Sequence, residues 1–143
     1  MNFFSKKTIV IIGLPDRIAE AIQNFFKNAE PGYFIHVFGS NEFEVSGAED
    51  IFSRCDMALF NPEVCPWYGR ASGEPELGIK IISRWRRRGF DIPLFAIINT
   101  DGQQLKELLD AGATKVMGNN PHTIANSVRL YFMTTHRRHQ RAA

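Results

Sequence analysis

Five short apolar runs, separated by stretches with helical periodicity, constrain the fold of this chain most strongly. The runs lie at residues 8–12, 33–38, 56–60, 92–98 and 115–117. In the first run, TIVII, β-branched residues follow one another without alternation, as they do in strands that are buried on both faces. Such a strand belongs in the interior of a parallel sheet.

Between these runs, apolar residues recur at every third or fourth position, and glycine, proline or a capping residue marks the ends of each stretch. Helices are predicted to start near Asp16, Ser46, Pro75, Thr100 and Pro121. Parallel strands need crossover connections, and these are right-handed. The alternation therefore predicts an α/β fold with a five-stranded parallel sheet, doubly wound by helices on both faces.

The length of the chain, 143 residues, is enough for one sizeable core but too small for two. With 44% hydrophobic and 22% charged residues, the composition is that of a folded protein. We expect one domain at residues 1–135 and a basic, frayed tail at residues 136–143. No apolar run reaches the roughly 18 residues of a membrane span, and the N-terminus lacks the features of a signal peptide, so we expect a cytoplasmic protein.

The cysteines and histidines do not indicate a metal site. Cys55 and Cys65 form no CxxC pair and are too few for a disulfide framework, so reduced thiols are expected. The histidines form no ligand cluster with them. The turn at residues 13–17 is neither a Walker A loop nor a GxGxxG motif, and the chain has no GxSxG nucleophile elbow. We expect no metal, no cofactor and no enzymatic activity.

Asparagines follow several of the predicted strands. In a doubly wound sheet, functional residues lie at the carboxyl ends of the strands. The residues at these ends include Gly13, Asn61, Asn99 and Asn119. The three asparagines would either bind a neutral polar ligand or form hydrogen bonds with one another.

Three segments of the chain, by their order and intervals, resemble bacterial response-regulator receiver domains, which have the flavodoxin-like fold of chemotaxis response regulators. They are DMALFNP at residues 56–62, GIKII at 78–82 followed by IPLF at 92–95, and DAGATKVM at 110–117. The resemblance covers roughly residues 8–132. It implies a module of two-component signal transduction, that is, of a phosphorelay-type system.

The resemblance also implies where phosphorylation chemistry would lie. Active receiver domains bind Mg²⁺ with an acidic pair after the first strand and accept phosphate on an aspartate after the third strand. They use a threonine or serine after the fourth strand and a lysine after the fifth. At these positions this chain has, in order, Gly13 and Leu14, Asn61, Ile98 or Asn99, and Asn119.

These replacements predict a degenerate receiver domain. The carboxamide of Asn61 is a poor nucleophile for phosphoryl transfer. Mg²⁺ prefers carboxylate and other hard oxygens, and the acids nearest in sequence to the strand ends are Asp16 and Glu63. We therefore expect a pseudo-receiver that acts by binding a protein partner. The alternative is a conventional phosphoryl-accepting regulator with displaced residues, for which Thr100 and Lys115 are the candidates.

The loop that follows the third strand is longer than in the usual receiver domain. At residues 62–74 it contains Trp67, Tyr68 and Arg70, which would lie over the former active site. Aromatic residues and arginine are favoured as interface anchors, so this loop is a candidate partner-binding segment. The other interpretation is that its aromatic side chains fold back and fill the vacated pocket.

The resemblance implies a further contact surface, because receiver domains commonly pair through helix four, strand five and helix five. A homodimer or a contact with another protein would there involve residues such as Lys106, Arg129 and Tyr131. The run RWRRR at residues 84–88 also resembles part of the receiver-like wing domain of bacterial ornithine, lysine and arginine decarboxylases, which serves assembly.

Two arginine clusters leave a nucleic-acid-binding module as another alternative. They lie at residues 84–88 and 137–141, within a chain whose net charge is only +2. Arginines could pair with phosphates there. Cations are also favoured near the C-terminus of a helix by the helix dipole, and this simpler interpretation predicts a solvated helix end.

Overall fold

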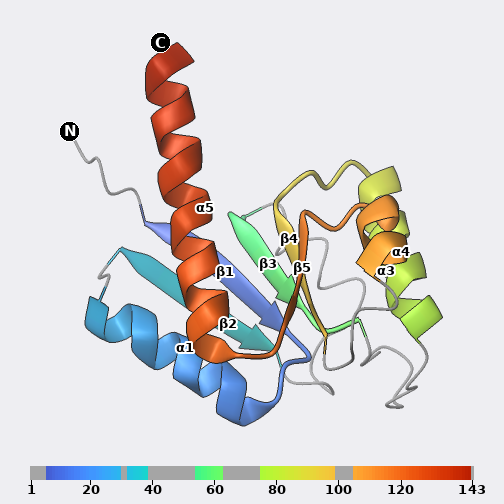
Figure 1. Cartoon of the computed structure of the whole chain (residues 1–143), viewed down its shortest axis with the longest axis horizontal. Helices are drawn as coiled ribbons and strands as arrows, with labels where there is room; N and C mark the ends of the chain where they lie inside the picture. Colours follow the sequence, from blue (N-terminus) through green and yellow to red (C-terminus); the bar gives the residue numbers. More distant parts are fainter. Residues whose placement is uncertain (1–5, 30–31, 39–53, 63–74, 99–104, 143) are drawn as a thin grey trace.

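The computed structural model describes residues 6–29, 32–38, 54–62, 75–98 and 105–142. Within them lie one sheet and four helices (Figure 1). The strands are β1 (Lys7–Ile12), β2 (Tyr33–Phe38), β3 (Met57–Phe60), β4 (Leu94–Ile98) and β5 (Lys115–Gly118). The helices are α1 (Asp16–Ala29), α3 (Pro75–Arg87), α4 (Leu105–Ala111) and α5 (Pro121–Ala142).

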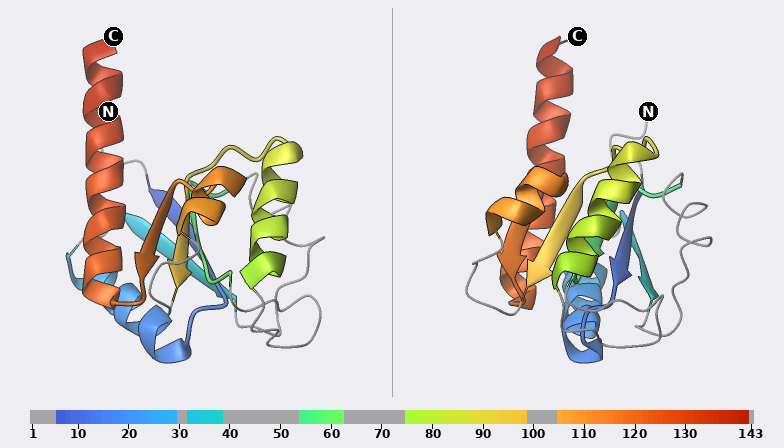
Figure 2. Two further views of the ribbon diagram at one scale, coloured as in Figure 1. Left: turned by 45° about the vertical axis from the view of Figure 1, so that its right-hand side comes forward. Right: turned by 90° about the vertical axis from the view of Figure 1, so that its right-hand side faces the viewer.

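All strand pairs are parallel, and the strand order is β2-β1-β3-β4-β5. Helices α1 and α5 cover one face of the sheet, and α3 and α4 cover the other (Figures 1 and 2). The predicted doubly wound, five-stranded parallel sheet is therefore confirmed. The short helix predicted near Ser46 lies outside the described residues.

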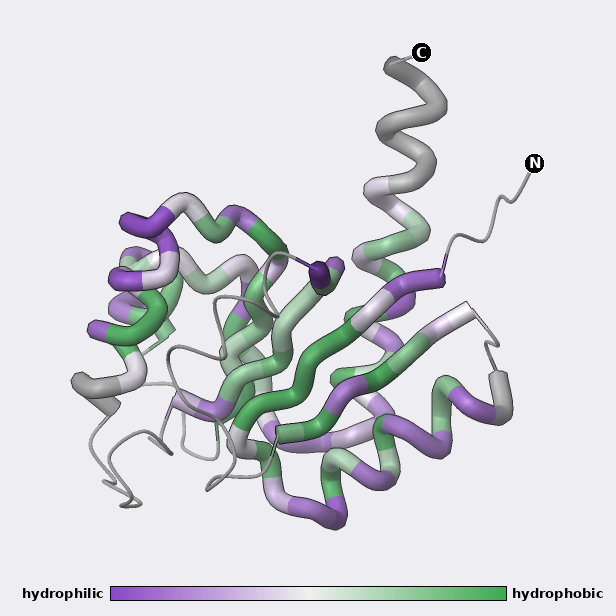
Figure 3. Tube along the Cα trace, turned by 180° about the vertical axis from the view of Figure 1, so that it is seen from behind, coloured by the Kyte–Doolittle hydropathy of each residue, from purple (hydrophilic) through white to green (hydrophobic). Residues whose placement is uncertain are grey.

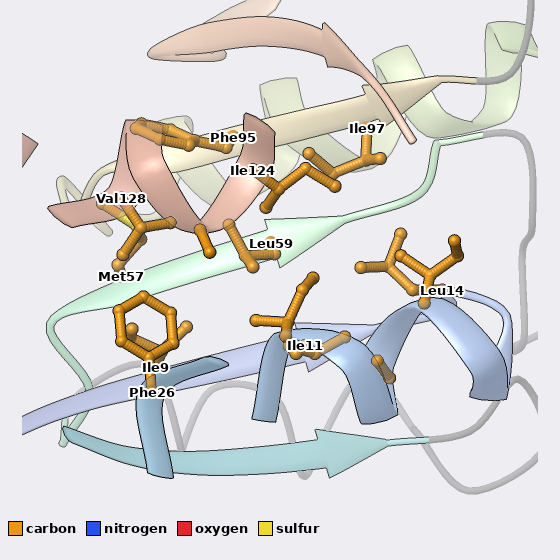
Figure 4. Packing of buried hydrophobic residues seen from close by; sticks show 14 residues of the cluster. Ile9, Ile11, Leu14, Phe26, Met57, Leu59, Phe95, Ile97, Ile124 and Val128 are labelled. Carbon is orange, nitrogen blue, oxygen red and sulfur yellow. The ribbon is translucent and has the colours of Figure 1, made fainter. Parts of the chain in front are cut away.

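The hydrophobic core consists of two layers, one on each side of the sheet. Val10 and Ile12 of β1 face the layer under α3 and α4, whereas Ile9 and Ile11 face the layer under α1 and α5 (Figure 4). All four side chains have no exposed surface, which confirms that β1 is buried on both faces. Figure 3 shows that β1 is apolar along most of its length after a polar start, in contrast to the alternation of polar and apolar residues along α1.

Helix α5 is longer than the sequence predicts. A frayed tail was expected after Thr135, but the helical backbone continues to Ala142. The segment HRRHQRA at residues 136–142 has no glycine or proline, and its arginine, glutamine and alanine residues are good helix formers. In both views of Figure 2, this end of α5 extends well beyond the sheet.

The short helix α4 is anchored by a single buried side chain. Leu108 is fully buried, whereas Leu105 and Leu109 are 44% and 42% exposed. On α5, Leu130 and Met133 are likewise exposed. None of the described helices is long and apolar enough to cross a membrane.

Candidate functional site

The residues that follow the strands lie at one edge of the sheet, because all of its strands are parallel. The backbone N–H of Gly13 donates a hydrogen bond to the carbonyl O of Phe38 at 3.2 Å. The backbone N–H of Asn61 donates to the carbonyl O of Ile12 at 3.0 Å. The ends of β2, β1 and β3 are thus held together before any side chain contributes.

Asn61 is the one buried polar side chain among the described residues, with 3% of its surface exposed. Its Nδ2 donates a hydrogen bond to the carbonyl O of Gly13 at 3.3 Å. A buried amide needs such a partner, since an unsatisfied polar group costs about 1–3 kcal/mol. The side chain of Asn61 therefore joins the end of β3 to the turn after β1.

The turn after β1 brings no carboxylate into the protein interior. Gly13 has a φ of 76°, in the left-handed region that only glycine adopts without strain. The next residue, Leu14, is 5% exposed and packs in the core layer under α1 and α5 with Ile18 (Figure 4). Asp16 is exposed in the first turn of α1. An acid there is favoured by the helix dipole, which accounts for its position.

Pro62, which follows Asn61, packs closely against the first turns of α3. A Cβ atom built on Gly78 would overlap the carbonyl O and the Cβ of Pro62. Pro62 itself is buried. Close packing between Gly78 and Pro62 therefore fixes α3 against the end of β3.

Directly after β5, Asn119 and Asn120 differ in their roles. Asn120 caps α5, because its Oδ1 accepts hydrogen bonds from the backbone N–H groups of His122 at 3.0 Å and Thr123 at 3.1 Å. Asn119 is exposed. The structure thus brings Asn61 and Gly13 into contact. Asn99 and Thr100 lie outside the described residues, as do Trp67, Tyr68 and Arg70.

Lys115 does not lie where the displaced-residue alternative needs it. It pairs with Phe95, which in turn pairs with Leu59, two residues before Asn61. Its Nζ donates a hydrogen bond to the Oγ of Ser127 on α5 at 3.4 Å. The side chain of Lys115 therefore points toward α5 and not toward the carboxyl ends of the strands.

Comparisons with known proteins agree with this architecture. No family model and no curated protein matches the sequence. Among solved structures, a CheY-like response regulator receiver domain protein from Methanospirillum hungatei matches with a TM-score of 0.68. It is 14% identical, and the match covers 94% of this chain and 99% of that chain.

Two further structures match similarly. The signal receiver domain of a DNA binding response regulator from Colwellia psychrerythraea has a TM-score of 0.67 at 16% identity, covering 90% of this chain and 99% of that chain. The chemotaxis response regulator CheY4 of Vibrio cholerae has a TM-score of 0.64 at 14% identity, covering 87% and 98%. The chain has the receiver-domain fold. Because the sequence identities are this low, the likeness establishes the fold alone.

The Mg²⁺ site that the receiver-domain fold implies is not supported by the described residues. Gly13 offers no side chain, and Leu14 places an apolar side chain in the core. The buried Asn61 directs its N–H group at the carbonyl of Gly13, and the carboxamide oxygen that remains is neutral and carries less charge than a carboxylate. Asp16 carries the one carboxylate among the described residues that directly follow the strands, and it is exposed. These donors do not resemble the carboxylate-rich shell that Mg²⁺ prefers.

The residues predicted for a pairing surface differ in exposure. Lys106 is exposed on α4, whereas Arg129 and Tyr131 on α5 are half-buried. The ring of Tyr131 makes edge contacts with Phe95 and with Phe132, both at 5.8 Å between centroids. Much of Tyr131 therefore belongs to the core, which leaves Lys106 and the exposed leucines as the accessible part of this surface.

One arginine of the first cluster has a role that the sequence did not predict. A solvated helix end was expected, and Arg84, Arg87 and Arg88 are indeed exposed. Arg86, however, donates from Nε to the carbonyl O of Gly112 at 2.8 Å. Its Nη1 donates to the carbonyl O atoms of residues 90 and 92 at 2.7 and 2.8 Å. Burial lowers the pKa of Arg86, and the neighbouring charge of Asp91 opposes this effect.

Arg86 thus joins the end of α3 to the turns before β4 and β5. The aliphatic part of its side chain occupies the position of a Cβ on Gly112, whose φ is 124°. In the sequence, the glycine of the AGA segment at residues 111–113 indicated a position where another group could approach the backbone closely. The arginine that contacts it could not be singled out from its neighbours by spacing alone.

Proposed function

We propose that this chain is a pseudo-receiver: a signalling module that binds a protein partner and has no phosphorylation switch. The observation that carries the proposal is the hydrogen bond from Asn61 Nδ2 to the carbonyl O of Gly13. In the receiver-domain fold, the residue at this position would be the phosphoacceptor. Here it is a buried structural amide.

The chemistry of Asn61 supports this proposal. Phosphoryl transfer to a receiver domain requires a carboxylate that attacks the donor and forms an acyl phosphate. A carboxamide nitrogen has no available lone pair for that attack, and in this protein it is already a hydrogen-bond donor within the fold. The position after β3 therefore contributes to stability in this chain and not to catalysis.

The surroundings of Asn61 support the proposal independently. The residue at the acidic-pair position, Leu14, belongs to the hydrophobic core. Pro62 packs against Gly78, so the backbone beside Asn61 is closely covered. A phosphoryl group needs space and cationic partners, and neither is provided by these described neighbours.

The partner surface that we propose is formed by α4, β5 and α5. Its accessible apolar side chains are Leu105 and Leu109 on α4 together with Leu130 and Met133 on α5. Lys106, which is exposed on α4, would add a charged contact at the rim. A second copy of this chain or another cytoplasmic signalling protein would bury these side chains.

An amide NMR titration with Mg²⁺ and then beryllofluoride, a mimic of the acyl phosphate, tests the missing switch. We expect the resonances of Gly13, Asp16 and Asn61 to stay unchanged at additions of about 10 mM, where a millimolar site would be mostly occupied. A saturable shift of these resonances would contradict the proposal. The variant Asn61→Asp, titrated in parallel, shows whether a carboxylate alone restores binding.

A further inference from the structure

A groove lies between β5 and α5, remote from Asn61. Its volume is about 370 Å³, within the range of roughly 300–1,000 Å³ that is typical of small-molecule sites. Thr114 and Lys115 line it from the start of β5, and Ser127, Leu130 and Tyr131 line it from α5. It lies near the amino end of β5, whereas Asn61 follows the carboxyl end of β3.

The hydroxyl of Thr114 is prepared to donate a hydrogen bond. Its Oγ1 accepts one bond from the backbone N–H of Leu94 at 2.9 Å and a second from Nη2 of Arg86 at 3.4 Å. A hydroxyl oxygen has two acceptor lone pairs, so these bonds leave its O–H as the remaining group. As a residue, Thr114 is exposed and lines the groove, and an O–H group polarised by a guanidinium would be a strong donor to a ligand there.

Ser127 is arranged in the same way by a second cation. Its Oγ accepts a hydrogen bond from Lys115 Nζ at 3.4 Å. An ammonium has three N–H donors, so Lys115 can contact Ser127 and a ligand at the same time. Two hydroxyls, each next to a cation, therefore line one groove.

The rest of the lining favours an anion with an organic part. None of the described residues that line the groove is acidic. Leu130, which is 61% exposed, and the ring of Tyr131 provide an apolar surface beside the donors. An oxyanion would satisfy the donors, and an apolar or aromatic group would cover the leucine and the tyrosine.

We propose that this groove binds a small phosphorylated organic molecule. Thr114, Lys115 and Ser127 hold its phosphate group, and its organic part lies against Leu130 and Tyr131. The site does not depend on the absence of a phosphorylation switch, because it uses none of the residues around Asn61, but it shares Leu130 with the proposed partner surface.

The test is an amide NMR titration of the full chain with three probes: AMP, adenosine and inorganic phosphate. We expect AMP to shift the resonances of residues 114, 115 and 127 saturably, with a millimolar or tighter dissociation constant. Inorganic phosphate should shift the same resonances more weakly, and adenosine should leave them unchanged. If neither AMP nor phosphate causes a saturable shift there at about 10 mM, the proposal is wrong.

Matched variants separate this site from general attraction of anions. Lys115→Gln should weaken AMP binding by about tenfold or more, because it removes the cation and its bond to Ser127. Lys80→Gln removes an exposed lysine from α3, on the other face of the sheet, and should leave AMP binding unchanged. Equal weakening by the two variants would overturn the proposal. So would binding of a single-stranded oligonucleotide at these residues without any binding of AMP.

Discussion

The side chain of Asn61 donates a hydrogen bond from Nδ2 to the carbonyl O of Gly13, and this bond joins the ends of β3 and β1. An aspartate could not replace it, because a carboxylate would direct an acceptor at another acceptor. The amide is thus suited to the fold in a way that the acid would not be.

Asn61→Asp should lower the free energy of unfolding by about 1–3 kcal/mol at neutral pH, since it buries an unpaired charge and removes a donor. Burial raises the pKa of such an aspartate in the folded state above its unfolded value. Its destabilising effect should therefore be small below about pH 4 and increase as the pH rises toward 7. Urea denaturation at several pH values measures this dependence.

The control for this variant is Asn126→Asp, which makes the same chemical change at an exposed position on α5. It should change the free energy of unfolding by less than about 0.5 kcal/mol. An equal loss of stability in both variants would show that the hydrogen bond between Asn61 and Gly13 is not the cause.

The fold could be predicted from the sequence because its signals are local and repeat along the chain. The β-branched run that became β1 and the cap at Asn120 determine elements within a few residues, and the alternation of runs determines the parallel sheet. The end of α5 was predicted too early, because a polar segment that has no glycine or proline can continue a helix.

The site was predictable only in part. Resemblance to receiver domains identified Asn61 and Leu14 as replacements, but not that the first is a buried donor and the second a core residue. The contacts of Arg86 with Gly112 and of Lys115 with Ser127 join residues that are far apart in sequence. Such pairs depend on how the helices pack, which no local pattern specifies.

Gly78→Ala should destabilise the protein by about 1–3 kcal/mol, the usual cost of overpacking. The new Cβ would overlap the backbone and side chain of Pro62, and this cost should exceed the gain of about 1 kcal/mol in helix propensity. Gly118→Ala is the matched control, because a Cβ there meets nothing within 4 Å. If the two variants have the same midpoint of thermal unfolding, the contact between Gly78 and Pro62 is not tight.

Arg86→Met should lower the free energy of unfolding by about 2–4 kcal/mol. The methionine keeps much of the packing, but the carbonyl groups of Gly112, Phe90 and Ile92 lose their charged donor. Arg87→Met changes an exposed neighbour on the same helix and should have an effect of less than about 0.5 kcal/mol. Chemical denaturation of both variants distinguishes a structural arginine from a solvated one, and similar values would argue against the predicted role of Arg86.

Cys55 should make the stability of the protein depend on pH in the alkaline range. Burial raises the pKa of this thiol from 9.0 to about 11, so the folded state keeps its proton where the unfolded state has lost it. The unfolded state then binds fewer protons, and the free energy of unfolding should fall as the pH rises from about 9 to 11. Cys55→Ala should remove this part of the pH dependence while leaving the curve below pH 9 parallel to that of the unmodified chain. Thermal unfolding measured between pH 7 and 11 checks the prediction, and an unchanged alkaline slope in the variant would assign it to other groups.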